Sequence, residues 1–283
     1  MSFPVYVLGG TLIVASTAGG VIAAGQQRLL AVALAMAGAT ILLLFHSWYF
    51  DFYADDALIT LRYSHHLAEG SGPNWNSEGR VEGYTTFLWM GIHAGLAKIG
   101  IDIVNASRAL GLAAVVATML FMARLWQLWS DEESDAGIAS PFVIAAAMLA
   151  LVLTDGVAFW GFSGMETTAF MALLTLSAVL FLQEQRTPTQ GWGGLPWSAV
   201  AFAATAMTRP EGLLAVAVTA GFFALQASLA TDRREALRRL AAWSAIFLAL
   251  YGAYFVWRYT YYDYLLPNTF YAKVGTTSAI YER

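Results

Sequence analysis

Long apolar runs without charged residues constrain this sequence more than any other feature. Between Leu29 and Phe50 the chain has no Asp, Glu, Lys or Arg. One bilayer crossing takes about 20 apolar residues in a helix, and a helix satisfies its own backbone hydrogen bonds in lipid. Comparable runs occupy residues 5–24, 29–50, 84–100, 107–129, 141–160, 168–183, 196–208, 211–230 and 240–260. The pattern predicts an all-α, polytopic transmembrane helix bundle with about eight spans.

The composition agrees with lipid as the surrounding solvent. Of 283 residues, 58% are hydrophobic and 12% are charged, whereas soluble domains carry about 45–50% and about 25%. The net charge of −4 shows no basic excess, which argues against nucleic acid as a partner. The absence of cysteine excludes disulfides, thiolate metal sites and cysteine nucleophiles. The run 5–24 has no basic segment before it, so we interpret it as a span rather than a removed signal peptide.

Arginines in short loops predict the orientation of the helices. The densest basic cluster, Arg233 to Arg239, places segment 231–239 in the cytoplasm. Counting spans back from there puts 51–83 on the outer side, provided that 84–100 does not cross. That run is short and carries His93 and Lys98, so we predict a juxtamembrane or partly re-entrant helix at the outer interface.

With this topology the unusual polar segments all fall on one side of the membrane. They are 51–83, 163–167, 209–212 and 263–273. We therefore predict a single transmembrane module over 1–283, with 51–83 as its outer catalytic loop.

Two adjacent acids, Asp55 and Asp56, open the most informative segment. The residues that follow, Ala57 to Glu69, alternate apolar and polar positions as an amphipathic helix on a membrane surface does. Adjacent residues on a helix do not face each other, so the two carboxylates are expected to have different tasks. One can cap the helix and the other can point into a cavity. The alternative is that both are caps or solvated loop acids.

The loop after this helix combines amides, charges and aromatic rings, a mixture that suits carbohydrate. Its candidate sugar or acceptor ligands are Asn74, Asn76, Arg80, Glu82 and Tyr84. Further candidates in other segments are Glu166, Glu211, Asn268 and Tyr271. For Glu166 the alternative is a helix cap without a catalytic role.

A charged turn interrupts the apolar sequence at Arg209-Pro210-Glu211-Gly212. Charges at membrane depth are costly, and a broken helix there usually lines a wet cavity or lies inside protein. Arg209 could bind a phosphate with its planar fork, and the alternative is an ion pair with Glu211 or a neighbouring helix. Lys273 and Arg62 are further candidate phosphate ligands.

Four blocks of sequence resemble the GT-C membrane glycosyltransferases, most closely the terminal arabinofuranosyltransferases of actinobacterial cell-wall arabinan synthesis. The first is DDALITLRY (55–63) with HHLAEGSGPNWN (65–76) and GRVEGYT (79–85). The others are FWGFSGMET (159–167), TRPEG (208–212) and LPNTFYAK (266–273). They occur in the family's order between positions 55 and 273.

This resemblance implies a polyprenyl-phosphate sugar as donor and a cell-envelope glycan as acceptor. It places the protein in the cytoplasmic membrane, with the active site on the extracytoplasmic face. The catalytic acid of the first outer loop would be Asp55 or Asp56. Such enzymes continue through more spans after the last block, so we expect this chain to be the N-terminal portion of a longer protein.

The mechanism that follows is a single displacement with inversion. Asp55 accepts the proton of the acceptor hydroxyl, Asp56 caps the helix, and Arg209 stabilises the departing phosphate together with Lys273 or Arg62. No cofactor or metal site is implied, although the carboxylates of Asp55 and Asp56 could together bind a divalent ion. The alternatives are a transporter for an anionic solute, with Arg209 and Glu211 at a broken helix, and a non-catalytic scaffold.

Overall fold

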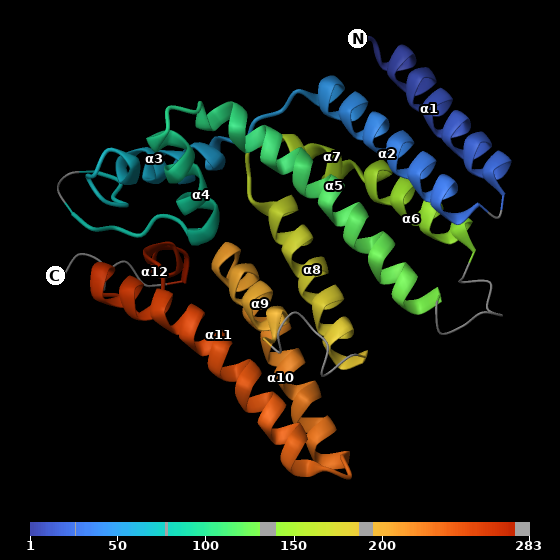
Figure 1. Cartoon of the computed structure of the whole chain (residues 1–283). Coiled ribbons are helices and arrows are strands. Elements are labelled where there is room, and N and C mark those ends of the chain that lie inside the picture. Colours follow the sequence, from blue (N-terminus) through green and yellow to red (C-terminus); the bar gives the residue numbers. More distant parts are fainter. Residues whose placement is uncertain (26, 77–78, 131–139, 187–194, 275–283) are drawn as a thin grey trace. The chain divides into compact units, whose positions relative to one another are not determined.

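The computed structural model describes residues 1–25, 27–76, 79–130, 140–186 and 195–274. These residues form helices joined by turns and loops, and no strand occurs among them. The chain divides into two compact units, one of 1–54 with 107–179 and one of 55–106 with 180–283. Figure 1 labels the helices of both units. The prediction of an all-α polytopic bundle is confirmed, and the prediction of a single module over 1–283 stays a prediction.

The first unit is built around α2, whose alanines allow close packing of its neighbours. Ala31, Ala35 and Ala39 lie one turn apart and are fully buried, as is typical of helix interfaces in membranes. The helices of this unit are α1 (Phe3–Ala24), α2 (Arg28–Phe50), most of α5 (Ile103–Ser130), α6 (Pro141–Leu153), α7 (Asp155–Phe162) and the first part of α8 (Thr167–Arg186).

The second unit combines a pair of short helices with a group of longer ones. Its helices, besides the end of α8, are α3 (Asp55–Ala68), α4 (Phe87–Lys98), α9 (Trp197–Thr208), α10 (Gly212–Leu229), α11 (Arg233–Tyr262) and α12 (Asn268–Val274). Trp243 of α11 is buried among Phe202, Phe223 and Phe247. Its indole N–H donates to Ser198 Oγ over 2.9 Å, so the polar edge of this large ring is satisfied inside the core.

Six helices in the described part of the chain are long and apolar enough to cross a membrane. The pair α6 and α7, bent by 63° at Thr154, would make a seventh. The expected number of about eight is higher because 196–208 forms only the 12-residue α9. The run 84–100 forms the 12-residue α4, which rises about 18 Å and cannot span a core of about 30 Å. The six long apolar helices make this a multi-pass membrane protein. The position of α4 at the membrane interface stays a prediction.

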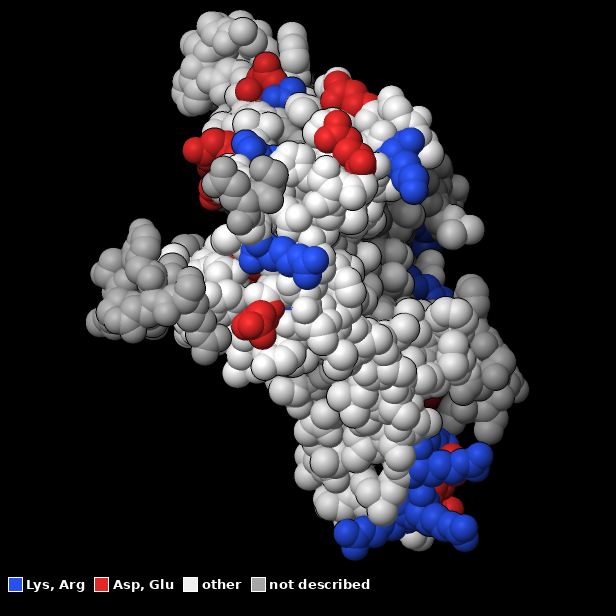
Figure 2. All heavy atoms as spheres, turned by 90° about the vertical axis from the view of Figure 1, so that its left-hand side faces the viewer, with Lys and Arg blue, Asp and Glu red and all other residues white. Residues whose placement is uncertain are grey.

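The two ends of α10 differ in chemistry. One end meets the Arg209–Glu211 turn, and the other leads into the arginine cluster at the start of α11. Figure 2 shows this cluster as blue side chains at the bottom of the view, where Figure 1 places the α10–α11 turn. The surface just above the cluster is largely uncharged, as expected for helices that face lipid.

We expect Gly212→Ala to destabilise the tight turn between α9 and α10. A Cβ at this position would lie 2.8 Å from backbone atoms of both Thr205 and Ala206, which cannot move aside as a flexible side chain could. Overpacking of this kind costs about 1–3 kcal/mol. Thermal unfolding in detergent would measure the loss, with Gly221→Ala on the same helix as control. A Cβ at Gly221 meets no atom within 4 Å, so equal stability of the two variants would contradict the prediction.

Candidate active site

The acidic pair lies at the first turn of α3, where both side chains are exposed. The amphipathic helix expected over Ala57 to Glu69 is present as α3. Asp55 Oδ1 accepts a hydrogen bond from the backbone N–H of Asp56 over 3.0 Å. This contact reaches only the next residue, whereas a helix cap accepts from the second or third N–H of the helix, so the expected capping role of Asp56 stays a prediction. No hydrogen bond of the Asp56 side chain is found within the described ranges.

Helix α3 is held against α4 by hydrogen bonds in its buried face. Ser64 Oγ donates to the carbonyl oxygens of Thr60 and Met90, both over 2.9 Å. Thr60 Oγ1 lies 3.3 Å from Thr86 Oγ1. These contacts fix the helix that carries Asp55, so its carboxylate is presented from a rigid support rather than from a flexible loop.

Two exposed arginines are held on aromatic rings beside the loop after α3. The guanidinium of Arg62 lies 4.4 Å from the centre of the Trp75 ring. It also donates to the carbonyl oxygen of Trp75 over 3.0 Å and to Asn76 Oδ1 over 3.1 Å. The guanidinium of Arg80 lies 4.4 Å from the centre of the Tyr261 ring. Both arginines face solvent, so they present fixed positive charge at this surface.

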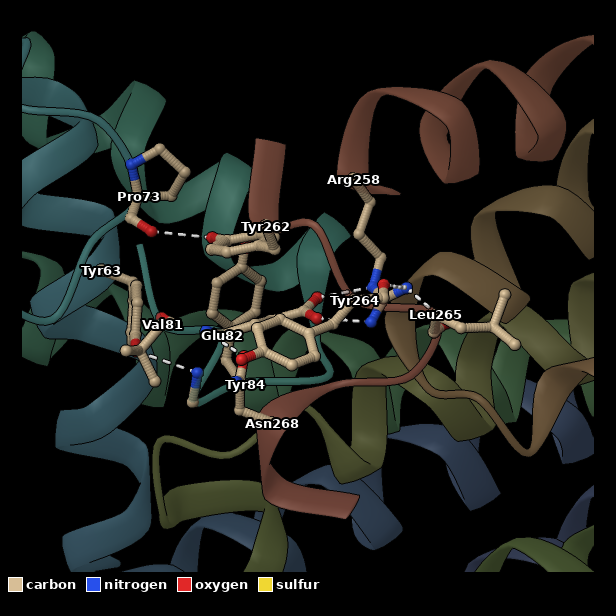
Figure 3. Close-up of polar contacts among 11 residues, drawn as sticks. Tyr63, Pro73, Val81, Glu82, Tyr84, Arg258, Tyr262, Tyr264, Leu265 and Asn268 are labelled. Carbon is tan, nitrogen blue, oxygen red and sulfur yellow. Dashed lines mark hydrogen bonds and ion pairs between the residues drawn. The ribbon is translucent and has the colours of Figure 1, made fainter. Parts of the chain in front are cut away.

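A buried ion pair joins this loop to the last long helix (Figure 3). Glu82 and Arg258 are 1% and 4% exposed, and their side chains meet in two hydrogen bonds of 2.6 and 2.8 Å. Arg258 also donates to the carbonyl oxygens of Leu265, over 2.9 Å, and Tyr264, over 3.4 Å. Burial raises the pKa of the Glu82 carboxyl, and the guanidinium opposes that rise. Both carboxylate oxygens of Glu82, a predicted sugar ligand, therefore face a guanidinium inside the unit.

The backbone around Glu82 is held as firmly as its side chain. Its N–H donates to Asn268 Oδ1 over 2.9 Å. The hydroxyl of Tyr63 donates to the carbonyl oxygen of Val81 over 2.8 Å and accepts from the N–H of Gly83 over 2.9 Å. The loop thus has hydrogen bonds to α3 on one side and to α12 on the other, which leaves it little freedom.

Two tyrosines at the end of α11 complete the attachment of the loop. The hydroxyl of Tyr262 donates to the carbonyl oxygen of Pro73 over 2.7 Å and lies 3.2 Å from the Tyr84 hydroxyl. The hydroxyl of Tyr261 donates to Asn74 Oδ1 over 2.9 Å. Tyr84 is 4% exposed, so this candidate ligand, like Asn74, lies within the internal network.

Arg209 and Glu211 form an ion pair at the break between α9 and α10. Arg209 Nη2 lies 3.1 Å from Glu211 Oε1, and the Glu211 side chain is 61% exposed. Partial burial raises the pKa of Glu211, but hydrogen bonds from Arg209 and from the backbone N–H of Glu211, together with the charge of Arg209, outweigh it and hold that pKa below its usual range. Of the alternatives left open by the sequence, the structure contains the internal pair, and a phosphate would have to compete with Glu211 for the guanidinium.

The remaining candidates differ in how well they can meet a ligand. Tyr271 is half-buried, with its ring centre 5.8 Å from that of Tyr264. The backbone of Lys273 belongs to α12, and its side chain lies outside the described part of the chain. Glu166 is 3% exposed and belongs to the first unit, whereas all the other candidates belong to the second. Within the described ranges, no group of three or more His, Asp or Glu residues could hold a metal ion.

Sequence reasoning missed Arg258, the partner of Glu82. Its signal was a charged residue inside an otherwise apolar run, which marks an internal partner or a functional site. It also missed a pair in the first unit, where Arg108 Nη1 lies 3.3 Å from Asp51 Oδ1. The Arg108 guanidinium lies 4.3 Å from the centre of the Phe162 ring.

Comparison with known proteins gives one distant relative. No protein-family model matches the chain, and no solved structure matches it. The chain is 28% identical over 249 residues to the terminal β-(1→2)-arabinofuranosyltransferase of Mycobacterium tuberculosis. The match covers 85% of this chain but 38% of that enzyme, so the chain spans well under half of its relative's length. The chain is thus a distant relative of an arabinofuranosyltransferase, and its own apolar helices are long enough to cross a membrane.

Proposed function

We propose that the chain is part of a membrane glycosyltransferase of the GT-C type. Its donor would be a polyprenyl-phosphate sugar, such as arabinofuranose or another pentose or hexose, and its acceptor a cell-envelope glycan outside the cytoplasmic membrane. The observation that carries the proposal is the exposed acid pair on the braced helix α3. It lies in a chain that is similar over 85% of its length to an arabinofuranosyltransferase.

In the proposed reaction Asp55 is the general base. Its carboxylate takes the proton of an acceptor hydroxyl as that oxygen attacks the anomeric carbon of the donor sugar. The bond from this carbon to the phosphate oxygen breaks, and the polyprenyl phosphate leaves with the electron pair. The contact between Asp55 Oδ1 and the Asp56 N–H leaves the other carboxylate oxygen for the proton. A single displacement inverts the anomeric configuration.

Fixed arginines of the second unit are the proposed partners of the departing phosphate. Arg62 is held on Trp75 and Arg209 is held by Glu211, so neither needs to be ordered when the donor arrives. A preorganised guanidinium stabilises charge that develops on a phosphate oxygen. Lys273 remains a third candidate on the basis of its position in the sequence.

The acceptor would lie along the exposed part of the loop after α3. Asn76 and Arg80 are exposed there, and both can hydrogen-bond to hydroxyl groups. Glu82, Tyr84, Asn74 and Asn268 contribute by holding the loop in shape, given their partners inside the unit.

The direct test is transfer by purified, detergent-solubilised protein in its longest native form. A panel of polyprenyl-phosphate sugars would be incubated with arabinan or other glycan acceptors, and the product linkage determined by NMR. Transfer with inversion is the expected result. Retention would contradict the single displacement. Absence of donor binding in every form, together with solute flux in liposomes that Arg209→Ala abolishes, would replace the transferase with a transporter.

Arg209→Ala is expected to lower the transfer rate by about 10²-fold, the usual effect of removing one donor that stabilises developing negative charge. Arg209→Lys keeps the charge but loses the bidentate fork, so its rate is expected between those of Arg209→Ala and the wild type. Steady-state kinetics with the best donor would measure both variants. A wild-type rate for Arg209→Ala would remove Arg209 from the site.

A further inference from the structure

A hollow in the first unit lies between α1 and the bent pair of helices α6 and α7. It is a cavity of about 320 Å³. Its lining includes Tyr6 and Val14 of α1, His46 of α2, and Leu153 and Asp155 at the break between α6 and α7. Helix α2 packs against both α1 and α6 (Figure 1). All the lining residues belong to the first unit, and none of them is a residue of the candidate active site.

The buried histidine of this cavity has one ring nitrogen without a partner. His46 is 6% exposed, and its Nδ1 lies 3.1 Å from the carbonyl oxygen of Val152. Because a carbonyl oxygen only accepts, Nδ1 carries the proton, and Nε2 of the neutral ring is left as an acceptor. Nε2 has no hydrogen-bond partner within the described ranges, and it is not sealed inside the core. His46 therefore presents an unused acceptor to the cavity.

The charge of the lining is negative. Asp155, in the first turn of α7, is exposed, and the lining contains no lysine or arginine. The hydroxyl of Thr11, another lining residue, donates to the carbonyl oxygen of Val7 over 2.8 Å, so its oxygen is also left to accept. A carboxylate and further acceptors suit a ligand that carries positive charge and several N–H groups.

The cavity lies near one end of its helices. Tyr6 belongs to the first turn of α1, and His46 lies one turn before the end of α2. The Tyr6 ring stacks on that of Tyr49 with 3.8 Å between ring centres, and such rings gather at the level of lipid headgroups. The segment after α2, 51–83, is the one predicted to be outside, so the cavity belongs to the outer leaflet. Val14, two turns further along α1, continues the lining towards the bilayer interior.

We propose that this cavity binds the ammonium headgroup of phosphatidylethanolamine from the outer leaflet. The ammonium would donate to the Asp155 carboxylate and to His46 Nε2, and an acyl chain would lie along Val14 and Leu153. A primary ammonium has three N–H donors, and its hydrogen bond to a carboxylate is charge-assisted. The trimethylated ammonium of phosphatidylcholine has no N–H, so the site should distinguish the two lipids.

The test is lipid selection by the purified protein in nanodiscs of equal parts phosphatidylethanolamine and phosphatidylcholine with the same acyl chains. Native mass spectrometry would count the lipids that remain bound, and enrichment of phosphatidylethanolamine is expected. Asp155→Asn should lower this enrichment about tenfold or more, the usual effect of losing a hydrogen bond to a charged group. Asp263→Asn is the matched control, because Asp263 is exposed at the end of another apolar helix and has a φ of 59°, which asparagine tolerates. It should leave the enrichment unchanged.

A variant that fills the cavity without changing charge separates a built site from general electrostatic attraction. Gly10 lines the cavity, and a Cβ there would meet only Leu42 Cδ1, at 3.9 Å. Gly10→Leu should therefore fold and lower the enrichment severalfold. Gly19→Leu is its control, because a Cβ at Gly19 of the same helix meets no atom within 4 Å. Thr11→Leu replaces Gly10→Leu if size-exclusion chromatography shows that Gly10→Leu does not fold.

Three outcomes would overturn the proposal. Equal retention of both lipids by the wild type would show that the ammonium is not recognised. Loss of enrichment in Asp155→Asn, but in neither filling variant, would show diffuse attraction instead of a built site. Displacement of the bound lipid by excess free ethanolamine would assign the cavity to a soluble amine, whereas a site that also holds an acyl chain should keep its lipid.

Discussion

Asp55→Asn is expected to lower sugar transfer by about 10²–10⁴-fold while the protein still folds and binds its donor. The amide keeps the size of the side chain and its hydrogen bond to the Asp56 N–H, but it cannot take a proton from the acceptor. The effect should therefore fall on kcat rather than on the donor KM. Single-turnover transfer and a separate donor-binding measurement would distinguish the two.

The neighbouring carboxylates of α3 provide the controls. Asp56→Asn reports on the adjacent acid, which is expected to matter less. Glu69→Gln makes the same change in charge at the other end of the helix, where Glu69 pairs with His65 over 3.1 Å at an exposed position. It should leave transfer unchanged. A large loss in Asp56→Asn with little loss in Asp55→Asn would assign the base to Asp56, and no loss in either would exclude both.

Glu82→Gln and Arg258→Met are each expected to lower the free energy of unfolding by about 3–5 kcal/mol. Each change leaves the other member of a buried pair without its partner in a place that water does not reach. Arg258→Met also removes the donors to the carbonyl oxygens of Tyr264 and Leu265. Unfolding monitored in detergent, with circular dichroism as readout, would measure both variants.

The double variant and an exposed pair sharpen this test. With both members replaced by neutral residues, no buried charge remains, so the loss should be smaller than the sum of the single losses. Glu211→Gln removes a member of the exposed Arg209–Glu211 pair and should cost at most about 1 kcal/mol. If Glu82→Gln costs no more than Glu211→Gln, the buried pair does not hold the loop.

Much of the fold followed from the sequence because apolar runs in a membrane protein have few alternatives. The spans near 5–24, 29–50, 107–129 and 211–230 correspond to α1, α2, α5 and α10. The helix after Asp55 was predictable from its alternation of apolar and polar residues. The count of spans was less predictable, because a run such as 196–208 has the composition of a span but too few residues.

The partners within the candidate site could not be predicted. A glutamate such as Glu82 can bind a sugar hydroxyl or a guanidinium equally well. Its partner is Arg258 because the fold brings α11 next to the loop. Asn268, which stays a predicted ligand, also accepts a hydrogen bond from the backbone N–H of Glu82 through Oδ1. Polar residues near a carbohydrate site thus divide into those that face the ligand and those that shape the loop, and this division depends on contacts between residues far apart in the sequence.

The ion pair between Glu82 and Arg258 also limits the order in which parts of the protein can fold during synthesis. The two residues are 176 positions apart in the chain. At about 5–20 residues per second the ribosome needs about 10–35 s to make that stretch. Until then the loop that carries Glu82 has been synthesised but has no partner at α11. A failure to insert α11 would therefore expose a loop 176 positions earlier in the sequence to proteases.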